Sequence, residues 1–149
     1  MNAPRIRRAL ALVAVATGAL AGCSDSVNFP AELAGSFALT TANGQPLPYT
    51  LPGTPPGTTV VLHGGTLVLL DNGRFDEALF FTLTNASNPG GLNTGAETIG
   101  DVSVSNGQIT FSPRFEDSWT GSISANTISY QKVATAGVTV TFNWQRTGV

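Results

Sequence analysis

Hydrophobic and polar residues alternate along the chain from Glu32 onward, which is the pattern of half-buried β-strands. In the first such segment Gly35, Phe37 and Leu39 share one face. The last segment, from Val138 to Arg146, alternates without a break. No window outside the N-terminal segment has the period of an amphipathic helix. The pattern therefore predicts an all-β domain of about eight strands.

Turn residues separate these segments and mark where the chain reverses. Asp71-Asn72-Gly73 is a strong hairpin signal, Asn43-Gly44 ends the first strand, and Asn106-Gly107 marks a further turn. Two further segments are expected to be surface loops. Residues 45–59 carry five prolines, and residues 85–95 are polar and rich in glycine.

Similar hairpins recur along the chain, as in "GDVSVSNGQITF" and "GSISANTISY", at a spacing of about 20 residues. Such a repeat favours an up-and-down meander. About eight strands of this kind would close on themselves to remove exposed edges, which predicts a small antiparallel up-and-down barrel. A two-sheet β-sandwich is the alternative. Gly100 lies where the alternation changes phase, which predicts a β-bulge there.

Composition narrows the possible partners. Arg5, Arg7 and Arg8 are the only basic residues before Cys23, so from that residue on 7 − 3 = 4 basic residues face 9 acidic ones. The resulting net charge of −5, with no basic patch, argues against nucleic-acid binding. Because Cys23 is the single cysteine, the chain can form no internal disulfide.

The N-terminus has the three parts of a secretory signal. A positive segment, "MNAPRIRR", precedes "ALALVAVATGAL", an apolar run too short for a membrane span, which needs roughly 20 residues. Leu20-Ala21-Gly22-Cys23 follows and resembles the lipobox of bacterial lipoproteins, in which signal peptidase II cleaves before a lipid-modified cysteine. The resemblance implies that Cys23 is the lipidation site and the first mature residue.

This resemblance divides the chain into a lipoprotein signal peptide (residues 1–22), a lipidated cysteine with a tether (23–31) and a barrel domain (32–149). It implies a cell-envelope protein bound to the membrane through the lipid on Cys23. In Gram-negative lipoproteins an Asp directly after the cysteine favours the inner membrane. Ser24 stands there in this chain, so we expect the outer membrane, on its periplasmic side.

The domain itself resembles the small lipocalin-like domains of bacterial lipoproteins. The resemblance rests on "LAGSFALTTANGQPLP", on the Pro-rich first loop and on the closing "VTFNWQR". Lipocalins begin strand one with Gly-x-Trp and end the barrel with an Arg that packs across that Trp. Gly35 and Arg146 match, and Phe37 replaces the Trp. The resemblance implies a barrel-closing pair of Phe37 and Arg146, and a small hydrophobic or amphipathic ligand.

Glu77 interrupts an apolar face that it shares with Phe75 and Leu79. Two interpretations stay open. Glu77 points into the barrel, where it orients a ligand or pairs with Lys132, or a bulge turns it outward.

The remaining polar residues give no clear chemistry. His63 is the only histidine, no Gly-x-Ser-x-Gly motif is present, and we expect His63 at the surface. Glu116, Asp117 and Arg114 are interpreted as a solvated loop cluster. We therefore predict no catalytic residue, no metal site, no cofactor and no enzymatic activity.

Two functions follow from these expectations. The first is a lipid-anchored envelope protein whose barrel binds a small hydrophobic or amphipathic ligand. The alternative is an envelope interaction or inhibitor-type protein that uses its loops and has a filled, ligand-free barrel. A cavity above about 300 Å³ would favour the first.

Overall fold

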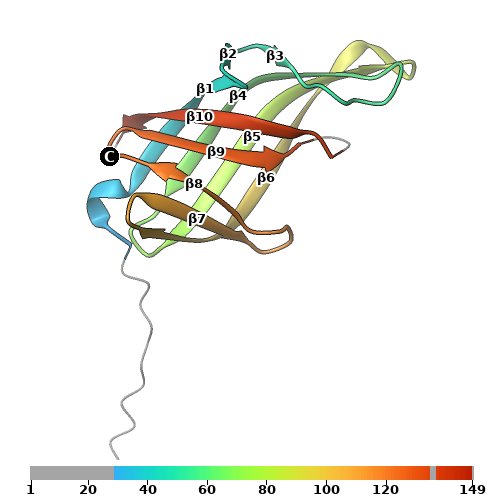
Figure 1. The fold of residues 1–149 in the computed structure, drawn as a ribbon. Coiled ribbons are helices and arrows are strands. Elements are labelled where there is room, and N and C mark those ends of the chain that lie inside the picture. Colours follow the sequence, from blue (N-terminus) through green and yellow to red (C-terminus); the bar gives the residue numbers. More distant parts are fainter. Residues whose placement is uncertain (1–28, 135–136, 149) are drawn as a thin grey trace, which may run out of the picture.

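The computed structural model describes residues 29–134 and 137–148. Within these residues, eight antiparallel strands form a closed barrel (Figure 1). The strands are β1 (Gly35–Ala42), β4 (Thr59–Leu69), β5 (Arg74–Asn85), β6 (Asn88–Ser105), β7 (Gln108–Pro113), β8 (Trp119–Ile123), β9 (Thr127–Val133) and β10 (Thr139–Gly148). The predicted all-β, up-and-down barrel is confirmed.

Closure depends on β1, which pairs along both of its edges. Phe37 lies opposite Arg146 of β10 on one side and opposite Leu67 of β4 on the other. From β4 to β10, each strand pairs with the next one in the chain. Because the sheet closes into one ring, the alternative of a two-sheet sandwich is excluded.

The Pro-rich connection between β1 and β4 is mostly a loop, as its prolines predict. It contains two short strands, β2 (Gln45–Pro46) and β3 (Tyr49–Thr50), which pair with the ends of β1 and β4. Leu51, which follows β3, is buried in the core. The connection therefore contributes an apolar side chain to the barrel core.

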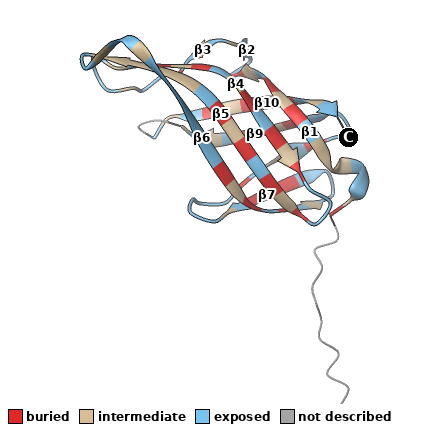
Figure 2. Ribbon diagram, turned by 180° about the vertical axis from the view of Figure 1, so that it is seen from behind, coloured by how far each residue is buried: buried red, intermediate tan, exposed pale blue. Residues whose placement is uncertain are grey.

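The predicted loop over residues 85–95 is wrong. β5 and β6 stay paired as far as Asn85 and Asn88, and their hairpin projects beyond the barrel (Figures 1 and 2). The pairing with β5 keeps this glycine-rich segment extended, and Thr82 reinforces it by donating a hydrogen bond to Asn93 Oδ1 at 2.8 Å. Paired backbone groups here override a composition that is typical of loops.

The predicted β-bulge at Gly100 is also wrong. β6 passes this residue without a register shift, with Gly100 opposite Phe75 of β5 and Pro113 of β7. A Cβ atom on Gly100 would lie 2.6 Å from the Cα of Pro113 and 2.9 Å from the Phe75 ring. This glycine therefore allows a close approach between neighbouring strands.

Aromatic side chains fill one half of the barrel interior. The Phe75 and Phe111 rings meet edge to face with centroids 5.0 Å apart, and Phe111 stacks on Trp119 at 5.5 Å. Tyr130 continues the cluster towards Trp144, with centroids 6.1 Å apart. Figure 2 shows buried positions alternating with more exposed ones along the strands. This half of the barrel is a packed core.

Arg146 closes that end of the barrel. Its guanidinium lies over the Phe37 ring, 4.8 Å from the centroid. It donates hydrogen bonds to four backbone carbonyls, those of Glu32, Leu33, Ala34 and Ala125, at 2.6 to 3.2 Å. Three of them belong to the short 3₁₀ helix η1 (Ala31–Leu33) and the residue after it. Arg146 thus ties the chain before β1 to the β8–β9 turn.

Gly35 makes room for this arginine. A Cβ atom there would lie 2.5 Å from Arg146 Nη1, and its φ of 147° is one that side chains disfavour. The Gly-x-Phe pattern at the start of β1 therefore has a direct structural role.

We predict that Arg146→Ala lowers the free energy of unfolding by about 3 kcal/mol, because it leaves four backbone carbonyls without their charged donor and uncovers Phe37. Urea denaturation of the variant measures this loss. Arg114→Ala, at an exposed position of the β7–β8 loop, is the control and should change stability by less than about 0.5 kcal/mol. Equal stability of the two variants would contradict the assigned role of Arg146.

Candidate functional site

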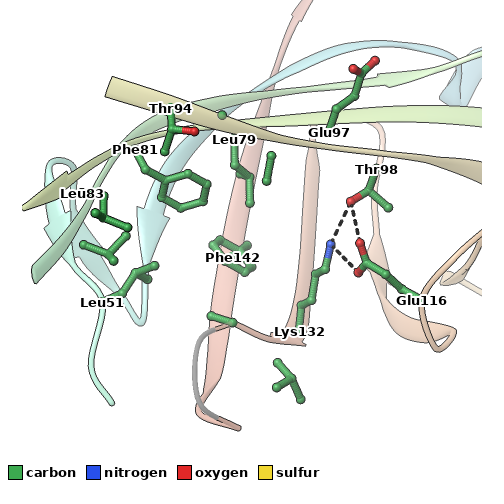
Figure 3. Close-up of a pocket in the computed structure, with 15 residues that line it drawn as sticks. Leu51, Leu79, Phe81, Leu83, Thr94, Glu97, Thr98, Glu116, Lys132 and Phe142 are labelled. Carbon is green, nitrogen blue, oxygen red and sulfur yellow. Dashed lines mark hydrogen bonds and ion pairs between the residues drawn. The ribbon is translucent and has the colours of Figure 1, made fainter. Parts of the chain in front are cut away.

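The end of the barrel opposite Arg146 holds a cavity of about 530 Å³ (Figure 3). This volume exceeds the roughly 300 Å³ at which small-molecule sites begin. Most of its wall is apolar, and the main side chains are Leu51, Val60, Leu79, Phe81, Leu83 and Phe142. The interior therefore changes from a packed core at one end to an open apolar chamber at the other.

Lys132 forms the polar part of the cavity wall. Its Nζ lies 3.2 Å from Glu77 Oε2, 3.0 Å from Glu116 Oε2 and 3.2 Å from Thr98 Oγ1. The same ammonium lies 4.4 Å from the centroid of the Trp119 ring. Lys132 thus joins residues of β5, β6 and the β7–β8 loop to β9, and its side chain is only 15% exposed.

Glu77 lies inside the barrel, with 1% of its side chain exposed. β5 pairs with β6 without a register shift from Arg74 to Leu83, so the alternation of the strand keeps Glu77 on the inner face. Its Oε1 accepts a hydrogen bond from the Tyr130 hydroxyl at 2.7 Å, and its Oε2 accepts one from Lys132. Of the two interpretations of Glu77, the first is therefore correct: its side chain points into the barrel and pairs with Lys132.

Tyr130 holds the deep end of this polar cluster. Its burial raises the pKa of the phenol well above the ordinary value, and the charge of Glu77 and the hydrogen bond to it raise this pKa further. Tyr130 therefore stays protonated at neutral pH and serves as a hydrogen-bond donor to the buried carboxylate.

Glu116 fills a gap in the barrel wall. β7 pairs with β6 only between Gly100 and Ser105, and β8 pairs with β9 only as far as Tyr130. Beyond these points Glu116 of the β7–β8 loop bridges β6 and β9, because its Oε1 accepts a hydrogen bond from Thr98 at 3.0 Å and its Oε2 pairs with Lys132 (Figure 3). Side-chain contacts here replace a strand ladder.

Sequence reasoning missed the part that Glu116 plays. The "SPRFED" segment has no periodicity, so its carboxylates are indistinguishable from solvated loop residues. Only the closure of the barrel brings Glu116 beside Lys132 and Thr98. Thr98 is 18 residues away from Glu116 in the chain. No sequence pattern indicated that Thr98 belongs to this polar cluster.

His63 lies away from the cavity, on the outer face of β4. It sits at a register shift between Leu62 and Gly64, and its Nε2 lies 2.7 Å from Thr82 Oγ1. Its described partner is therefore a hydroxyl and not a carboxylate. Among residues 29–134 and 137–148, no group of three or more His, Cys, Asp or Glu side chains is arranged to hold a metal ion.

Cys23 and the signal segment lie outside the described residues. In the part of the chain that the structure describes, no helix has the length and apolar character needed to cross a membrane. The predicted lipidation site therefore stays a prediction.

Comparison of the chain with protein-family models, with curated proteins and with solved structures gave no match.

We predict that the protein loses stability as the pH rises above about 10, where tyrosine ionises in the unfolded chain. Folded Tyr130 keeps its proton there because its pKa is raised, so alkaline pH favours the unfolded state. Urea denaturation at increasing pH measures this fall.

Tyr130→Phe should remove this part of the alkaline slope, and at neutral pH it should lower the free energy of unfolding by about 2 kcal/mol, because Glu77 loses a donor. Tyr49→Phe is the matched control and should keep the wild-type slope, since it leaves Tyr130 in place. An unchanged slope in Tyr130→Phe would show that Tyr130 does not cause the alkaline loss.

Proposed function

We propose that this chain is a lipid-anchored cell-envelope protein whose lipocalin-like barrel binds a small amphipathic molecule. The observation that carries the proposal is the cavity of about 530 Å³, which has an apolar wall and one polar cluster. Such a combination is typical of small-molecule sites, where a few polar groups orient a ligand that apolar side chains bury. The proposal assigns no catalytic residue.

The polar cluster supports binding because stability alone does not require it. Glu77 and Lys132 form an ion pair inside the barrel, and taking two charges out of water offsets most of their attraction. The other half of the same interior is filled by aromatic side chains without any such pair. A barrel selected only for stability would be expected to fill both halves in that way.

The alternative, an interaction protein that uses its loops, has less support. It presumes a filled barrel, whereas the cavity occupies one end of this one. Phe115 of the β7–β8 loop is 92% exposed and Phe80 of β5 is 49% exposed, but scattered exposed aromatic side chains are ordinary on protein surfaces.

The proposed anchor lies close in sequence to the first described residue. The described chain begins at Phe29, which is buried beside η1 at the end that Arg146 closes. Cys23 is six residues earlier in the sequence. Six residues span at most about 20 Å, so a lipid on Cys23 would attach within that distance of Phe29.

We predict that the mature protein lacks residues 1–22 and carries fatty acyl chains on Cys23. Labelling of expressing cells with an alkyne fatty acid, followed by mass spectrometry of the N-terminal peptide, measures both. Cys23→Ser should abolish label and cleavage together, whereas Ser24→Ala should keep both. Label on the Cys23→Ser variant would contradict the assignment.

We predict that the neutral apolar dye N-phenylnaphthylamine binds in the cavity with increased fluorescence. Leu83→Trp should weaken binding at least about tenfold, because the indole would occupy space along the half-buried wall. Leu70→Trp, at a position 43% exposed near the closed end, is the control and should bind as the wild type does. Equal binding by both variants would place the dye outside the cavity.

A further inference from the structure

The charged groups at the cavity carry an excess of negative charge. Among the described residues, Glu97, Glu116 and Lys132 line it, and Glu77 lies directly behind Lys132. Three carboxylates and one ammonium therefore lie at the cavity, a net charge of 1 − 3 = −2. Glu97 points away from the cluster of Thr98, Glu116 and Lys132, so it contributes to the field at the rim (Figure 3).

Lys132 has no donor to spare for a ligand. An ammonium group has three N–H donors, and three acceptors surround it, on Glu77, Glu116 and Thr98. An anionic head group could reach Lys132 only by displacing the Thr98 hydroxyl or a carboxylate that is already bound there. Either exchange would add a further negative charge to a site that already carries an excess of negative charge.

Glu116, by contrast, can accept more. Its side chain is 44% exposed, with Oε1 bonded to Thr98 and Oε2 to Lys132. Each carboxylate oxygen can accept two hydrogen bonds, so each keeps one acceptor site. The cavity wall beside Glu116 is mostly apolar, so its carboxylate lies where the polar head and the apolar chain of a bound amphiphile would meet.

We propose that the polar head of the ligand is a primary alkylammonium group that binds to Glu116 at the cavity rim. The alkyl chain then lies along the apolar wall formed by Leu79, Phe81 and Phe142. This assignment rests on the proposed function of the cavity and names the class of its ligand. Lys132 positions Glu116 by holding its Oε2 against β9.

Three probes with the same chain test the head group: decylammonium, decanol and decanoate. The chain from Ser24 onward is used, because the closed barrel, its core and the cavity all lie within residues 29–148. Isothermal titration at neutral pH and low salt, below the micelle concentration, measures each affinity. Decylammonium should bind at least about tenfold more tightly than decanoate, with decanol between them. Added salt should reduce the difference in affinity between decylammonium and decanoate, because it screens the charges.

Glu116→Gln keeps the shape of the side chain and removes its charge, so it should reduce the preference for decylammonium severalfold and leave decanol binding unchanged. Glu32→Gln, at the closed end, is the matched control and should keep the full preference. Decanoate binding as tight as decylammonium would overturn the cationic class but leave the cavity function standing. Failure of all three probes to bind would overturn the cavity function, and this inference with it.

Discussion

The closure of β1 against both β10 and β4 is the constraint on which the rest of the structure depends. It turns a meander into a ring, and only a ring encloses an interior in which alternate side chains meet. Arg146 secures this closure from one end through four backbone carbonyls and the Phe37 ring. Because the closure removes the free edges of β1, β4 and β10, the backbone groups there are satisfied without further covering elements.

The same closure creates two chemically different halves of one interior. Near Arg146, rings of Phe75, Phe111 and Trp144 fill the space between strands. Towards the other end, β7 and β8 are too short to complete the wall, and Glu116 bridges the gap to Thr98 and Lys132. The cavity and its polar cluster thus share a cause, because short strands leave both the open space and the side chains that line it.

Local sequence patterns predicted what depends on alternation and turns. They indicated the strands, the hairpin at Asp71-Asn72-Gly73, the barrel and the apolar inner faces.

The local patterns failed where contacts between distant strands decide the conformation. Pairing with β5 keeps residues 88–95 extended, and the approach of Pro113 explains Gly100. The position of Glu77 was open because alternation alone cannot exclude a bulge. No local pattern indicated the contact between Glu116 and Thr98, because it forms only when the barrel closes.

We propose that this barrel carries an amphipathic molecule. Native mass spectrometry of the chain from Ser24 onward, after incubation with a lipid extract of bacterial envelopes, tests it most directly. We expect a reproducible added mass that is lost on denaturation and belongs to an amphiphile with a cationic head. Bare protein at every extract concentration would show that the barrel carries no such molecule.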